Sequence, residues 1–199
     1  MASIKELIQK GNIQDKSKLP NMYLFLNMYN KGIFKIVYEN EKYFSIVPSN
    51  KDGPQPLDNT AKSPMSLIHA LVCPKARIWN AVDIEEMKQF DKVMALECAN
   101  ESVRRLRESE FHPGCLYDRL KEVNEKKMWS DVAEKTNDLE KAKELSMTIE
   151  YSFHLYPYNS VNHLHMHVWC PKLATKSYDL QMQKNPNKNA PMDKVLQTL

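Results

Sequence analysis

The chain has 199 residues, of which 42% are hydrophobic, and a formal net charge of +3, values that suit one domain with a packed core. No apolar run reaches the roughly 18 residues of a membrane-spanning helix, and the opening MASIKELIQK lacks the apolar stretch of a secretory signal. The four cysteines form no C-x-x-C pair, which excludes a zinc knuckle or a dithiol redox motif. We therefore expect no membrane partner and a reducing location, the cytoplasm, with the nucleus as the alternative.

The N-terminal part predicts two helices. Ser3 followed by Glu6 has the spacing of a capping box, which predicts a short helix within residues 1–21, an N-terminal helical extension. The apolar segment YLFLNMYNKG after Pro20 ends at Gly32, as a helix with a glycine stop does.

Extended structure is predicted next. The runs FKIVY (34–38) and KYFSIV (42–47) are rich in β-branched and aromatic residues and are separated by a short polar segment, a pattern typical of a hairpin. Residues 48–64 contain four prolines and predict a loop. The apolar run SLIHALVC (66–73) then predicts a third strand.

Helical spacing returns in the middle of the chain. Apolar residues recur at this spacing over residues 83–109, with Asp83 near the start, and predict one long amphipathic helix. Residues 115–146 are rich in lysine and glutamate and show the same spacing, so we interpret them as an inserted helical element.

Two further strands are predicted near the C-terminus, MTIEYSFHLY (147–156) and NHLHMHVWC (162–170). The last residues, 172–199, are polar and rich in lysine and asparagine, and we expect an extended tail. The predicted fold class is therefore α+β: an antiparallel five-stranded sheet with one long helix, plus a helical insertion and N-terminal helices.

The most informative segment is HLHMHVW, in which His163, His165 and His167 alternate with apolar residues. On a strand, successive side chains point to opposite faces, so the three imidazoles are expected to share one face while the apolar residues pack into the core. Half of the chain's six histidines stand within these five positions, which favours a functional cluster over scattered structural histidines.

Two kinds of chemistry suit such a cluster. Alternating histidines on a strand can hold zinc or iron. Such a site needs a fourth ligand, usually a carboxylate or histidine on an adjacent strand, and a second shell of carboxylates, and this strand has no Asp or Glu. Alternatively, a neutral imidazole can attack phosphorus while neighbouring donors hold the non-bridging oxygens. A histidine-cluster metalloprotein and a nucleophilic enzyme are therefore both open at this point.

The segment HLHMHVW matches, at every position, the His-φ-His-φ-His-φ-φ signature (φ, apolar) of the histidine-triad family. Upstream, the run from His69 to Lys75, HALVCPK, resembles the other signature of that family, H-x-L-V-φ-P-K. The hairpin and the long helix also stand where the family has them. The resemblance covers residues 22–171, with 115–146 as an insertion, and implies a histidine-triad domain followed by a tail.

The resemblance also implies roles for individual residues. It makes His165 the nucleophile that attacks the α-phosphorus, with His167 and His69 contacting the phosphate oxygens. His163 resembles the histidine that orients its neighbours and so sets the tautomer of the nucleophile. Around the triad, the substrate-binding candidates are Ser160, His154 and Asn159.

The activity implied by the resemblance is that of a nucleotide hydrolase or transferase, which works through a covalent nucleotidyl-histidine without metal or cofactor. The branch is either a nucleoside phosphoramidase or dinucleotide hydrolase, or an aprataxin-like deadenylylase. The partner is a nucleotide or nucleotide conjugate, with nucleic acid as a weaker alternative. We expect a homodimer formed through the helix at 83–109, with a monomer as the alternative. A non-catalytic nucleotide-binding protein of the same fold is the remaining functional alternative.

One departure from the family concerns ribose binding. Pro48 stands near the place where many members carry an acidic residue that binds the ribose hydroxyls. Asp52 and Asp58, in the loop that follows, are the acidic candidates to replace it. The sequence therefore predicts weak discrimination at the ribose.

Overall fold

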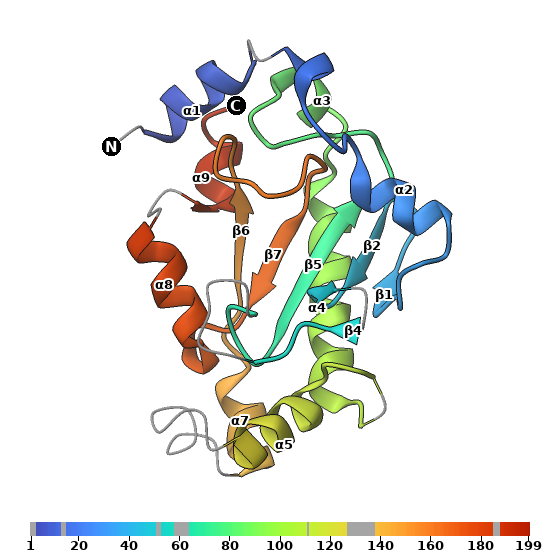
Figure 1. Ribbon diagram of the computed structural model, residues 1–199, viewed down its shortest axis with the longest axis vertical. Helices are drawn as coiled ribbons and strands as arrows, with labels where there is room; N and C mark the ends of the chain where they lie inside the picture. The colour runs from blue at the N-terminus through green and yellow to red at the C-terminus, as the bar shows by residue number, and fades with distance from the viewer. Residues whose placement is uncertain are drawn as a thin grey trace.

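The computed structural model contains a central antiparallel sheet with helices on both faces (Figure 1). The residues it describes are 3–12, 15–50, 53–57, 64–110, 112–126, 138–184 and 188–199. Among the described helices, none has the length and apolar character to cross a membrane.

The central sheet has the strand order β1-β2-β5-β7-β6-β8, and every neighbouring pair is antiparallel. Its strands are β1 (Tyr38–Glu39), β2 (Tyr43–Ile46), β5 (His69–Pro74), β6 (Glu150–His154), β7 (Met166–Trp169) and β8 (Asn189–Pro191). The α+β class is as predicted, but the described sheet has six strands where the sequence predicted five. Two very short strands, β3 (Ser49–Asn50) and β4 (Gly53–Pro54), pair with each other inside the predicted loop.

The helices of the described residues are α1 (Ile4–Asn12), α2 (Leu24–Asn30), α3 (Ile84–Met87), α4 (Lys92–Glu108), α5 (Leu116–Lys126), α7 (Leu139–Leu145), α8 (Lys176–Lys184) and α9 (Met192–Leu196). The capping box at the start of α1 is confirmed, because the Glu6 N–H donates to Ser3 Oγ and the Ser3 N–H donates to the Glu6 carboxylate. The chain turns after α2 at Gly32, whose φ of +65° favours glycine.

The single long helix predicted over residues 83–109 is wrong, because the structure divides it into α3 and α4. Asp83 caps α3 by accepting from the Glu86 N–H, and Asp91 caps α4 by accepting from the Met94 N–H. The Asp91 N–H itself donates to the Tyr43 hydroxyl of β2. A second capping aspartate held by the sheet therefore starts a new helix, which apolar periodicity alone did not show.

The two faces of the sheet have different covers. α4 packs against β1, β2 and β5 on the face behind the strands in Figure 1, and the main core lies between them. On the opposite face α2 lies over β5, and a smaller apolar cluster lies beneath it. The predicted alternation is confirmed on β7, since Met166 and Val168 are in the main core while His167 is on the other face.

The predicted extended tail at 172–199 is also wrong. The described part of this segment contains α8, β8 and α9, and β8 adds a sixth strand by pairing with β6. Ala190, Met192 and Val195 are buried in the main core. β8 and α9 span only three and five residues, too short for a strand or helix period to stand out in the sequence.

We predict that Met192→Ala lowers the free energy of unfolding by about 2–5 kcal/mol, the usual cost of truncating a buried methionine. Met192 is 3% exposed, whereas an extended tail would tolerate the change. Urea denaturation would measure the effect, with the exposed Lys194→Ala in the same helix as the matched control, expected within about 0.5 kcal/mol of wild type. Equal stability of the two variants would contradict the packing of α9.

Candidate active site

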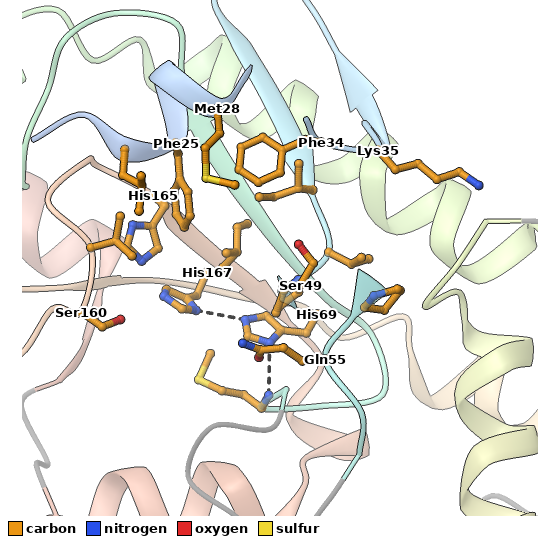
Figure 2. Close-up of a pocket in the computed structure, with 18 of the residues that line it drawn as sticks. Phe25, Met28, Phe34, Lys35, Ser49, Gln55, His69, Ser160, His165 and His167 are labelled. Atoms are coloured by element: carbon orange, nitrogen blue, oxygen red, sulfur yellow. Dashed lines mark hydrogen bonds between the residues drawn. The ribbon is translucent and has the colours of Figure 1, made fainter. Parts of the chain in front are cut away.

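A cavity of about 880 Å³ opens on the face of the sheet that α2 covers. Its apolar lining includes Leu24, Phe25, Met28, Phe34, Ile46 and Leu71, and Figure 2 shows Phe25, Met28 and Phe34 on one side of His167 and His69. The histidines of the lining come mainly from β5, β6, β7 and the segment leading into β7. The cavity therefore has room for a ligand that combines an apolar part with a polar one.

His165 lines the cavity just before β7 begins. Its Nδ1 lies 2.8 Å from the main-chain oxygen of His163, and because a carbonyl only accepts, Nδ1 must carry the proton. Burial lowers the pKa of His165 from 6.5 to about 4, so the ring is neutral at pH 7. Nε2 is therefore an unprotonated nitrogen available to a ligand. The Phe25 ring meets this imidazole edge to face, with 5.2 Å between the ring centroids.

His69 and His167 form a hydrogen-bonded chain that begins at a main-chain amide (Figure 2). The Met65 N–H donates to His69 Nδ1 over 3.1 Å, so the single proton of the neutral His69 ring is on Nε2. That nitrogen lies 3.0 Å from His167 Nδ1 and donates to it. The neutral His167 ring must then carry its own proton on Nε2, and no described residue accepts from that buried group.

Burial keeps both rings of this chain neutral. It lowers the pKa of His69 from 6.5 to about 3 and the pKa of His167 well below its ordinary value. Because the main-chain N–H of Met65 cannot act as an acceptor, it fixes the tautomer of His69, and His69 in turn fixes the tautomer of His167. The cluster therefore contains a fixed donor, the buried His167 Nε2–H, on a ring that lines the cavity together with His165. The ring centroids of His165 and His167 are 5.0 Å apart.

His154 is the fourth imidazole of the cluster. Its ring stacks on His167 with 3.7 Å between centroids, and its Nε2 lies 2.5 Å from the Asn189 amide oxygen of β8. Nε2 is therefore the donor, and Nδ1 is left buried without a partner among the described residues. One ring nitrogen from each of His154, His165 and His167 lies within 4.8 Å of the other two.

The remaining predicted residues divide into two groups. Ser160 lines the cavity beside the cluster, and its contact with substrate stays a prediction. Asn159 does not line it, because its amide donates within its own loop to Val161 and Asn162. The His163 side chain is buried next to Phe25 and outside the cavity. His163 acts on His165 through its main-chain carbonyl, a contact that the sequence pattern could not assign to the backbone.

Many cavity residues were not predicted. The polar and charged ones among them are Lys35, Ser49, Gln55, His112, Gln181 and Lys188. Pro48 also lines the cavity, while Asp52 and Asp58 lie outside the described residues. No aspartate or glutamate is among the described lining residues, whereas two lysines are. The charge of the cavity therefore favours an anionic ligand.

The three-histidine cluster also tests the metal interpretation. For His167 Nε2 to bind a cation, its proton would have to move to Nδ1, which faces His69 Nε2. His69 would then need its own proton on Nδ1, where the Met65 N–H already points. The hydrogen-bond chain therefore disfavours His167 as a metal ligand and favours it as a donor to an anion.

No family model matches the chain, and no curated protein matches it in sequence. Among solved structures, the chain is similar to that of the aprataxin ortholog Hnt3 from Schizosaccharomyces pombe, with a TM-score of 0.32 and 14% sequence identity. The match covers 90% of this chain and 78% of that one. At this TM-score and identity, the likeness carries no argument about the activity of the chain.

The buried neutral histidines predict that the protein loses stability as the pH falls below 6.5. Unfolding exposes them to water, where their pKa is near 6.5, whereas burial holds His163 and His165 at about 4 and His69 at about 3. The unfolded chain therefore binds more protons throughout this interval, and acid favours it.

Urea midpoints measured between pH 7 and about 5, where ordinary carboxylates stay ionised, should fall with decreasing pH. His163→Gln should show a shallower fall, since it removes one buried imidazole outside the cavity. Midpoints that stay constant over this interval would contradict the neutral cluster.

Proposed function

We propose that the protein is a nucleotide hydrolase or transferase that forms a covalent nucleotidyl intermediate on His165. The observation that carries the proposal is the pair formed by an unprotonated nitrogen on His165 and a fixed donor on His167. Phosphoryl transfer needs this pair: a nucleophile for the phosphorus and a donor for a non-bridging oxygen. The lack of carboxylates in the described cavity lining suits a phosphate as well.

In the first step, the Nε2 lone pair of His165 forms a bond to the α-phosphorus, and the bond from phosphorus to the leaving group breaks with its electron pair staying on the leaving group. The Nδ1–H bond to the His163 carbonyl holds the ring in line and stabilises the positive charge that develops on it. In the second step, water or another acceptor attacks phosphorus, the N–P bond breaks, and a proton of the acceptor is released. The imidazole returns to its starting tautomer.

The lining of the cavity suits the remaining part of the proposed substrate. A phosphate held by the histidines leaves the apolar end, beside Phe25 and Phe34, for the nucleoside base. Aromatic and aliphatic side chains at this end provide stacking and dispersion contacts, which discriminate little between one base and another. We therefore propose a nucleotide or nucleotide conjugate as the substrate class. The leaving group of the preferred substrate would distinguish a phosphoramidase or dinucleotide hydrolase from a deadenylylase.

Two rival functions fit the site less well. A metalloprotein is disfavoured by the tautomer of His167, and a non-catalytic nucleotide-binding protein would not need the unprotonated nitrogen of His165.

The homodimer stays a prediction. The exposed face of α4, on which it would depend, carries ion pairs between Arg104 and the side chains of Glu101 and Glu108. The cytoplasmic location likewise stays a prediction.

His165→Asn should lower kcat/KM by at least about a thousandfold, because asparagine cannot form the N–P bond. The wild type, mixed with an adenylate-donating substrate and quenched in base, should carry one nucleotidyl group on the peptide that contains His165. Peptide mass spectrometry would locate the group. A His165→Asn protein with the urea midpoint of the wild type and turnover within about tenfold of it would contradict the proposal.

A further prediction concerns recognition of the ribose. Pro48, Ser49 and Gln55 line the cavity, and no carboxylate is among the described lining residues. Neutral hydrogen bonds contribute about 0.5–1.5 kcal/mol, less than the 1.5–3 kcal/mol of bonds to a charged group. Matched ribo and 2′-deoxy substrates should therefore differ only about two- to tenfold in kcat/KM. A ratio of about a hundred or more would reveal a ribose carboxylate, and Asp52→Ala and Asp58→Ala would then show which loop residue supplies it.

A further inference from the structure

The C-terminal segment adds a cation to the cavity. Lys188 stands immediately before β8 and lines the cavity together with His154, His165 and His167. Its neighbour Asn189 is fixed by the hydrogen bond to His154 and by pairing of β8 with the end of β6. Lys188 is therefore attached to the same framework that holds the histidines.

Lys188 has no counter-ion in the part of the chain that the structure describes. No described carboxylate forms an ion pair with it, and none lines the cavity. Burial lowers the pKa of its ammonium group from the ordinary value, because the charged form has lost water without gaining an acidic partner. An anionic ligand would supply that partner.

The strand order shows which part of a ligand would reach Lys188. The apolar part of the cavity lies on the α2 and β2 side of the sheet. His69 comes from β5 and His167 from β7, in the middle of the sheet, and Lys188 comes from the opposite edge at β8. A nucleotide whose base occupies the apolar end and whose α-phosphate meets the histidines would extend its remaining groups toward Lys188. Lys35, the other lysine of the lining, points away from the histidines in Figure 2.

We propose that Lys188 binds an anionic leaving group, so that the enzyme prefers substrates in which a second phosphate is joined to the α-phosphate. This inference rests on the proposed function. When the bond to the bridging oxygen breaks, its electron pair stays on the leaving phosphate, and the Lys188 ammonium stabilises the added negative charge without giving up a proton. A nucleoside phosphoramidate, whose leaving group is an amine, gains less from this contact.

The test compares Lys188→Met and Lys188→Arg on two substrates that share one nucleoside, a pyrophosphate-linked dinucleotide and a phosphoramidate. Loss of a charged hydrogen bond predicts a fall of about 10–150-fold in kcat/KM for the dinucleotide in Lys188→Met. The fall for the phosphoramidate should be at least about tenfold smaller, and Lys188→Arg should recover most of the loss. Lys194→Met, an exposed lysine of α9 outside the cavity lining, is the matched control and should equal the wild type.

A binding measurement separates this inference from the proposed function. Calorimetry on the His165→Asn background would compare AMP with ADP, whose second phosphate occupies the leaving-group position. Lys188→Met should lower the preference for ADP over AMP by about tenfold or more. Equal loss for AMP and ADP, or no loss for either, would overturn the inference whatever the turnover. If the wild type cleaves neither substrate but the ADP preference still depends on Lys188, the proposed function fails and the anion subsite stands.

Discussion

The main-chain N–H of Met65 determines which nitrogens of His69 and His167 donate and which accept. It bonds to His69 Nδ1, His69 then donates to His167, and His167 therefore carries its proton on Nε2. A second main-chain group, the His163 carbonyl, sets His165 in the opposite sense, with its free nitrogen unprotonated. Fixed backbone groups thus give two chemically similar side chains opposite tautomers, without an acidic residue, as the roles that we propose for them require.

The sheet makes this arrangement possible. Antiparallel pairing of β5 with β7 brings His69 into hydrogen-bond contact with His167, and β8 brings Asn189 to His154. Burial of the four imidazoles keeps them neutral in the free protein. The cluster therefore needs no bound anion to balance its charge, and the cavity is open to an anionic ligand.

The sequence predicted the α+β class, the capping box of α1 and the alternation that places His167 on the open face, because each depends on a local pattern. It did not predict the break at Asp91 or the strand β8, since both depend on contacts between distant segments. For the same reason Lys188, in a lysine-rich stretch with no motif, could not be placed in the cavity. The tautomers of His69 and His167 could not be predicted either, because they depend on the main-chain N–H of Met65, and a main-chain contact leaves no pattern in the sequence.

The central claim is the protonation pattern of the cluster, and nitrogen-15 NMR of the imidazoles at pH 7 tests it most directly. We predict that His165 carries its proton on Nδ1 and that His69 and His167 carry theirs on Nε2, with all three rings neutral. His165→Asn would assign the His165 signals by their loss. A His167 ring protonated on Nδ1, or a His165 ring protonated on Nε2, would contradict the account.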